Sequence, residues 1–154
     1  MKNIASDIKN KSFKPIYLLY GDEQYLKTAC LRQLRQAIVG EDAMNLSEYA
    51  DKADVKELIS VAGTLPFFAD RRLIVLNRVS LFKNNNDEIN ELMDNIPSYL
   101  TVVIVEDNID KRKTLYKIIN KKGYICEISR LSDGDLTKWA VKKLSDAGFK
   151  IRGS

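Results

Sequence analysis

The residues best placed for chemistry follow the first apolar run of the sequence, where a phosphate-binding loop would lie. Residues 21–28 can be compared with the motif G-x-x-x-x-G-K-[ST], whose lysine and hydroxyl contact phosphates and magnesium. Gly21, Lys27 and Thr28 match this motif, but Leu26 occupies the position of its second glycine. Because that glycine lets the main chain approach a phosphate closely, a leucine side chain there would obstruct the loop.

The second half of a nucleotide site is also missing. An acidic residue after a neighbouring strand normally helps to hold magnesium, whereas the apolar run at 73–76 is followed by Asn77 and Arg78. Asp22 and Glu23 add negative charge where a phosphate would lie. The pattern therefore predicts the shape of a nucleotide site without its chemistry, and no bound cofactor.

Composition restricts other catalytic chemistry. The chain has no histidine, which excludes histidine-based triads and histidine-ligated metals. Its two cysteines, Cys30 and Cys126, cannot form a cysteine-rich zinc site. Glu106, Asp107 and Asp110 follow an apolar run, at the side of the sheet where α/β proteins bind ligands. We interpret them as a solvated loop and a helix cap, so no catalytic residue and no metal ligand is predicted.

A second stretch, residues 63–77, carries an apolar cluster instead of catalytic groups. Pro66 suits the first position of a helix, so residues 66–69 are expected to form about one helical turn. Neighbouring helical residues point about 100° apart, so one turn is poorly placed to bury both Phe67 and Phe68. In one interpretation at least one ring is left for a partner. In the other, both rings fill the core beneath a loop.

The remaining sequence must supply the elements that position these two stretches. Apolar and β-branched runs predict strands at 15–20, 44–49, 73–76, 101–105 and 124–128. Helical spacing predicts a short helix around Ile4 and Ile8 and further helices at 24–39, 55–62, 89–96 and 135–147. Another helix is expected to carry Leu115, Ile118 and Ile119 and to stop at Gly123. Asp54 and Asp110 are the expected helix caps. The alternation predicts an α/β fold with a five-stranded parallel sheet and helices on both faces.

Three segments make up the expected domain organisation. Residues 1–133 form the α/β domain, 134–152 the first helix of a truncated helical domain, and 153–154 a cloning remnant. The helix at 135–147 carries an apolar face that a single helix cannot bury alone, made of Leu136, Trp139, Ala140 and Leu144.

Charge and hydropathy suggest where the protein works. No apolar run reaches the length of about 20 residues that spans a bilayer, and the N-terminus lacks the apolar core of a signal peptide. A cytoplasmic protein without a membrane is therefore expected. A net charge of +4 and a pI near 9.0 are compatible with work near nucleic acid.

The run from Leu65 to Arg72, Leu-Pro-Phe-Phe-Ala-Asp-Arg-Arg, is the most specific element of a resemblance that extends over most of the chain. With the runs at 15–23 and 110–113 and with Trp139, it resembles the N-terminal region of the δ subunit of bacterial DNA polymerase III, the clamp-loader subunit that opens the sliding clamp. The resemblance implies an AAA+-like, P-loop-like fold that has lost ATP binding, which agrees with the broken motif.

The resemblance also implies a site and partners. Phe67 and Phe68 would enter a hydrophobic pocket of the clamp, with Leu65 and Pro66 shaping the turn. The implied partners are the sliding clamp (β), other clamp-loader subunits that handle ATP, and primed DNA through the assembled complex. Two rival functions remain. One is a P-loop ATPase or kinase-like enzyme with a divergent loop. The other is a simple nucleic-acid-binding domain, although the sequence lacks a clear basic and aromatic stripe.

Overall fold

The fold is a parallel sheet between two layers of helices. The computed structural model describes residues 2–41, 43–83 and 85–129. Along the chain the elements are α1 (Lys2–Asn10), β1 (Ile16–Tyr20), α2 (Gln24–Val39), the 3-10 turn η1 (Ala43–Asn45), β2 (Leu46–Ala50), α3 (Val55–Ala62), β3 (Arg72–Asn77), α4 (Asp87–Asp94), β4 (Leu100–Glu106), α5 (Thr114–Lys122) and β5 (Tyr124–Glu127). The predicted helix at 135–147, and the segment 134–152 with it, lies outside the described residues.

The five strands confirm the predicted α/β class. All are parallel, in the order β2-β3-β4-β1-β5. Parallel neighbours place their carboxyl ends at one edge of the sheet. The loop that follows β1 therefore lies beside the loop that follows β4, although about 80 residues of sequence separate them.

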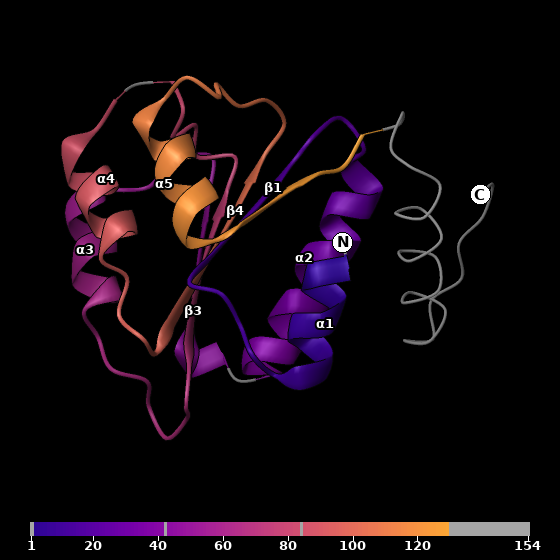
Figure 1. Cartoon of the computed structure of the whole chain (residues 1–154). Helices are drawn as coiled ribbons and strands as arrows, with labels where there is room; N and C mark the ends of the chain where they lie inside the picture. The colour runs from indigo at the N-terminus through magenta and orange to yellow at the C-terminus, as the bar shows by residue number, and fades with distance from the viewer. Residues whose placement is uncertain (1, 42, 84, 130–154) are drawn as a thin grey trace.

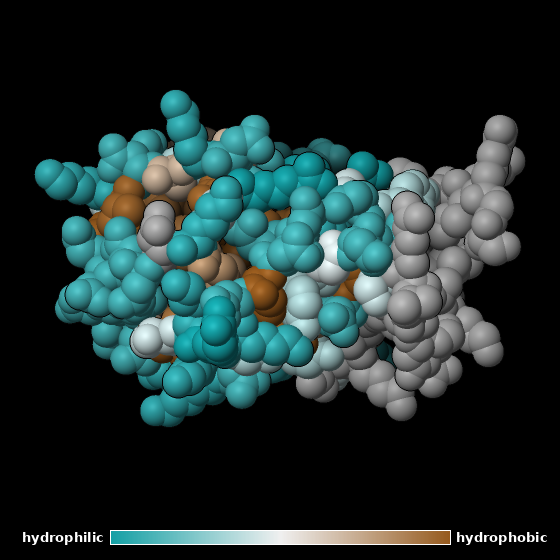
Figure 2. All heavy atoms as spheres, turned by 90° about the horizontal axis from the view of Figure 1, so that it is seen from above, coloured by the Kyte–Doolittle hydropathy of each residue, from teal (hydrophilic) through white to brown (hydrophobic). Residues whose placement is uncertain are grey.

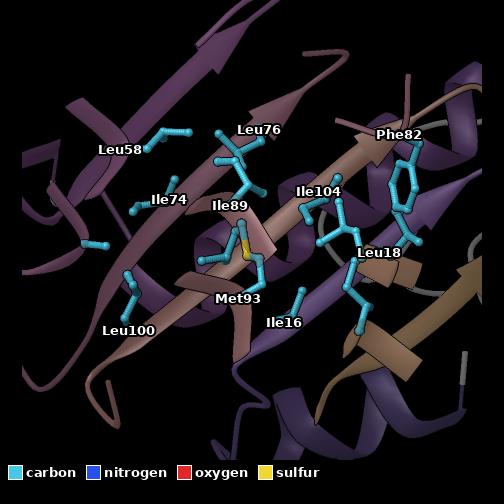
Figure 3. Packing of buried hydrophobic residues seen from close by; sticks show 14 of the residues in the cluster. Ile16, Leu18, Leu58, Ile74, Leu76, Phe82, Ile89, Met93, Leu100 and Ile104 are labelled. Carbon is cyan, nitrogen blue, oxygen red and sulfur yellow. The ribbon is translucent and has the colours of Figure 1, made fainter. Parts of the chain in front are cut away.

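Alternate residues of the strands face two separate apolar clusters. On β1, Ile16 and Leu18 pack toward α3, α4 and α5, whereas Tyr17 and Leu19 pack toward α1 and α2. Figure 1 shows these two helical layers on opposite sides of the sheet. Figure 3 shows the first cluster, in which side chains of α3 and α4 meet those of the strands: Leu58, Ile89, Met93, Ile74, Leu76 and Ile104. Among the described residues, no helix is long and apolar enough to span a bilayer.

The two predicted helix caps have different outcomes. Asp54 is the N-cap of α3, as expected, and its carboxylate accepts two main-chain amides of the first turn at 2.9 and 3.3 Å. The prediction for Asp110 is wrong, because α5 begins only at Thr114. The Asp110 carboxylate instead accepts from the main chain and guanidinium of Arg112, which stabilises the turn before the helix.

Two local predictions near the apolar stretch are also wrong. Residues 66–69 do not form a helical turn: residues 67–70 are bends and Pro66 has no regular structure. Phe68 has a φ of 52°, in the left-handed region that a right-handed helix excludes. The strand predicted at 44–49 begins later, at Leu46, because the residues before it form the 3-10 turn Ala43–Asn45. The first difference lies in the segment that carries the phenylalanine pair, and the second lies in a turn that contacts that segment.

Candidate functional site

The phenylalanine pair lies on a loop, residues 63–71, that joins α3 to β3 and that we call the anchor loop. The loop forms the lowest point of the view in Figure 1, at the end of the sheet where β3 begins. Leu65 is 71% exposed, Phe67 is 50% exposed and Phe68 is 94% exposed. The interpretation in which both rings fill the core is therefore wrong.

The two rings form one compact unit. Their centroids are 4.4 Å apart and their planes meet at 72°, an edge-to-face arrangement. Phe67 is half-buried and supports Phe68, which projects into solvent. The positive φ of Phe68 costs a non-glycine residue roughly 1–2 kcal/mol. Strain of this kind persists only where the surrounding structure holds it, and it is concentrated at functional sites.

Two polar side chains tie the anchor loop to the sheet. Asn45 binds the main chain of Phe67 through both of its polar atoms, with Oδ1 accepting from the amide at 2.6 Å and Nδ2 donating to the carbonyl at 2.9 Å. Arg71 donates to Thr101 Oγ1 at 2.9 Å and to the carbonyl of Phe13 at 3.4 Å. The exposed rings are thus carried on a main chain that is fixed from two sides.

The matched P-loop residues lie at the opposite end of the sheet, where Lys27 is fully engaged within the protein. Its side chain is 1% exposed, and Nζ donates to Asp107 Oδ1 at 2.7 Å and to the carbonyl of Glu106 at 3.1 Å. Gln24 Nε2 donates to the same Asp107 oxygen at 2.7 Å. A carboxylate of the chain therefore occupies the place that a phosphate oxygen takes beside a P-loop lysine.

Main-chain amides of the P-loop segment also donate hydrogen bonds to acceptors within the protein. The amide of Gly21 donates to the carbonyl of Asp107 at 3.2 Å, and the amide of Glu23 donates to the carbonyl of Ile128 at 3.2 Å. A Cβ at Gly21, whose φ is 133°, would lie 2.0 Å from that Ile128 oxygen. These amides, which in a P-loop would cradle phosphates, are bound to the end of β5 and the end of β4.

Leu26 and Thr28 complete the comparison with the motif. Leu26 packs against the cluster on the α1 and α2 side of the sheet. Thr28 lines a hollow of 290 Å³ beside Lys27, into which Asn77 also opens from the end of β3. Figure 2 views this end of the molecule from above and shows mainly hydrophilic side chains with hydrophobic ones set between them.

Glu106, the last residue of β4, and Asp107, which follows it, both have partners within the protein, although the Asp107 side chain is 44% exposed. Glu106 is buried and accepts from the amides of Ser80 and Leu81 at 3.0 and 3.4 Å. Burial raises the pKa of the Glu106 carboxyl, while those two amides act to lower it. Hydrogen bonds from Lys27 and then Gln24 hold the pKa of the Asp107 carboxyl below its usual value. In the part of the chain that the structure describes, no group of three or more acidic residues or cysteines could hold a metal ion.

Sequence reasoning missed two residues that the structure makes important. The sequence predicts Asn45 within a strand, and its distance of 22 residues from Phe67 along the chain gives no sign of the contact. Asp107 was treated as solvated, although a lysine at the P-loop position without a phosphate ligand needs a counter-ion when it is buried. A lysine at the P-loop position of a motif that cannot bind phosphate is the signal in the sequence that could have pointed to Asp107.

Two sequence comparisons point to the same family. A family model described as DNA polymerase III, delta subunit, matches residues 17–129. The DNA polymerase III subunit delta of Bacillus subtilis (strain 168) is 26% identical over 153 residues, covering 90% of this chain and 44% of that protein. This chain therefore spans less than half the length of that relative.

Solved structures show the same fold. A structure of the Bacillus subtilis DNA clamp loader delta protein superposes with a TM-score of 0.77 at 22% identity, covering 95% of this chain and 47% of that chain. A gamma subunit-related protein of DNA polymerase III from Thermotoga maritima superposes with a TM-score of 0.54 at 10% identity, covering 94% of this chain and 51% of that chain. The family model matches residues 17–129, most of the chain, and it establishes that the chain belongs to the DNA polymerase III delta subunit family.

Proposed function

We propose that this chain is the clamp-binding part of a clamp-loader δ subunit. In this role it binds the sliding clamp (β) and helps to open it, so that the clamp can be loaded onto primed DNA during replication. The other clamp-loader subunits supply ATP hydrolysis, and DNA is reached through the assembled complex. The family match over residues 17–129 and the fold it shares with the Bacillus subtilis clamp loader delta protein support the proposal.

The observation that carries the proposal is the exposure of the phenylalanine pair. Phe68 projects almost completely into solvent, and Leu65 and half of Phe67 are exposed beside it. Binding hot spots are enriched in large side chains that a partner buries completely in a pocket. A compact pair of rings on a strained, tethered loop has the form of such an anchor, and we propose a hydrophobic pocket of the clamp as its partner.

Clamp opening then follows from differential binding. A ligand shifts a conformational equilibrium only by as much as its affinities for the two states differ. If the ring pair and the surrounding surface bind the open or strained clamp better than the closed one, binding favours opening without any chemistry in this chain. The ring pair supplies the binding affinity, and the sheet holds the loop that carries the ring pair.

We propose no ATP hydrolysis by this chain itself, in contrast to the rival proposal of a P-loop enzyme. Gly21, Lys27, Thr28 and the 290 Å³ hollow beside them favour the rival. Against it, Lys27 is neutralised by Asp107, and the loop amides bind the chain's own carbonyls. A nucleotide would have to displace these contacts as well as overcome the missing glycine at Leu26.

The test is clamp binding by the double variant Phe67→Ala/Phe68→Ala, measured on immobilised sliding clamp from the same organism. Truncating hot-spot residues costs about 2–4 kcal/mol of binding, or roughly a 30- to 1,000-fold loss of affinity. Tyr25→Ala is the matched control, because Tyr25 is an aromatic residue exposed to the same extent as Phe67 but lies at the start of α2, at the other end of the sheet. Binding by the double variant at the parent's affinity, or equal losses in the control, would contradict the proposal.

A further inference from the structure

The side chain of Asn45 makes a two-point contact with the anchor loop. It has no exposed surface, and its two polar atoms bind the amide and the carbonyl of the same residue, Phe67. The pairing reproduces the two hydrogen bonds that one residue of a strand exchanges with its antiparallel neighbour. Because the contact has two points, it fixes the orientation of the Phe67 main chain as well as its position.

Asn45 is itself held on a regular part of the fold. It ends η1 and directly precedes β2, whose first residue, Leu46, pairs with Leu73 of β3. The anchor loop leads into the start of the same strand, β3. Asn45 therefore links the loop to the edge of the sheet across 22 residues of sequence. Binding groups are held most accurately when regular elements support them in this way.

The anchor loop needs such support because it has no regular structure of its own. Between Leu65 and Asp70 it contains neither helix nor strand, and Phe68 adopts a backbone conformation that phenylalanine rarely takes. A released loop would sample other conformations, including ones that fold the rings back onto the protein. Apparent affinity falls in proportion to the fraction of molecules in the binding-competent conformation.

We propose that Asn45 is a positioning residue for clamp binding, which rests on the proposed function of the ring pair. Its double hydrogen bond holds the main chain of Phe67 so that Phe68 is presented to the partner before the two proteins meet. Asn45 does not contact the clamp in this account. It raises affinity by keeping the loop in the competent conformation, and its loss lowers affinity although both rings remain in the sequence.

A purely structural role for Asn45 makes different predictions. A buried polar group must find hydrogen-bond partners wherever it lies, and removing any such group lowers the melting temperature. Asn86→Ala is the matched control for this effect. Asn86 caps α4 by accepting the amide of Ile89 at 3.0 Å. It lies in the connection that follows β3, whereas the anchor loop precedes β3. Its loss should lower stability without altering the loop.

Amide hydrogen exchange tests the tether without any clamp. In the parent chain the Phe67 amide should be protected from exchange, and in Asn45→Ala it should exchange at least about tenfold faster. Asn86→Ala should leave that rate unchanged under the same native conditions. Exchange of the Phe67 amide at the unprotected rate in the parent would overturn the proposal, and that measurement stands even if Asn45→Ala does not fold.

Clamp affinity then tests the positioning role. If the fraction of molecules in the binding-competent conformation falls to about a tenth, Asn45→Ala should bind the clamp about tenfold more weakly, mainly because association is slower. Asn86→Ala should bind as the parent does. Parent-like affinity of Asn45→Ala, with the Phe67 amide exchanging freely, would overturn the inference. If Phe67→Ala/Phe68→Ala binds as tightly as the parent, the clamp-binding proposal itself has failed, which the exchange experiment distinguishes from failure of the tether.

Discussion

The pair formed by Lys27 and Asp107 gives the sharpest test of how this chain departs from a nucleotide-binding protein. Lys27 is buried, whereas the Asp107 side chain is 44% exposed. Asp107→Asn should leave a buried ammonium that has lost its counter-ion. Breaking a fully buried pair in this way costs about 3–5 kcal/mol. Because Asp107 is partly solvated and the Glu106 carbonyl remains at 3.1 Å, we expect about 1–3 kcal/mol of lost unfolding free energy.

Removing the other partner should cost less. Lys27→Met takes away the buried charge and keeps most of the apolar stem, and it leaves Asp107 accessible to solvent and near Arg78. We expect a loss of at most about 1 kcal/mol. In the double variant, Asp107→Asn should add little to the loss of unfolding free energy that Lys27→Met causes alone. The expected coupling in a double-mutant cycle is therefore nearly the whole cost of Asp107→Asn, about 1–3 kcal/mol.

Urea denaturation followed by circular dichroism measures each corner of this cycle. The folded pKa of Asp107 is depressed, so its contribution to stability is present above its unfolded pKa of about 3.9 and is lost as the pH falls through the folded pKa. The coupling should shrink accordingly in acid. Coupling within about 0.3 kcal/mol of zero at neutral pH would refute the pairing. A clear rise in the melting temperature with ATP and magnesium would refute the wider reasoning, since ligand at a hundredfold its Kd stabilises by about 2.7 kcal/mol.

Two further predictions concern the buried acid and the end of the chain. Burial raises the folded pKa of Glu106, so its favourable contribution to stability is complete below its unfolded pKa of about 4.3 and is lost as the pH rises through the folded pKa. Urea denaturation at several pH values should therefore show the parent losing stability relative to Glu106→Gln over that range. A stability difference that does not change with pH would contradict this prediction. Removing residues 134–154 should leave a cooperative unfolding transition, because the described core draws on residues 4–128; a non-cooperative melt by circular dichroism would show that the removed segment is part of the core.

The strands and the broken motif could be predicted from the sequence because both depend on local residue types. Runs such as Leu73–Leu76 and Thr101–Val105 are β-branched or apolar throughout, and the structure places both in buried strands. The replacement at Leu26 is visible because a P-loop has fixed spacing. Asp54 was identified as a cap because its hydrogen bonds reach only two and three residues along the chain.

The contacts that shape the two candidate sites could not be predicted in this way. Lys27 meets Asp107 because β1 and β4 are neighbours, and strand order is a property of the whole sheet. Asn45 meets Phe67 across the end of β2 and β3. The left-handed conformation of Phe68 opposes the local preference of phenylalanine, and such conflicts between residue type and backbone are expected where function, rather than folding, selects the residue.

The most direct test of the central claim is a single variant, Phe68→Gly, measured for stability and for clamp binding. Glycine relieves a left-handed conformation that costs other residues roughly 1–2 kcal/mol, partly offset by glycine's greater freedom in the unfolded chain. Since the ring of Phe68 is almost fully exposed, we expect unfolding free energy equal to the parent's or higher by up to about 1 kcal/mol, together with clamp affinity at least about 30-fold weaker. Clamp binding at the parent's affinity by this folded variant would contradict the assignment of Phe68 as an anchor.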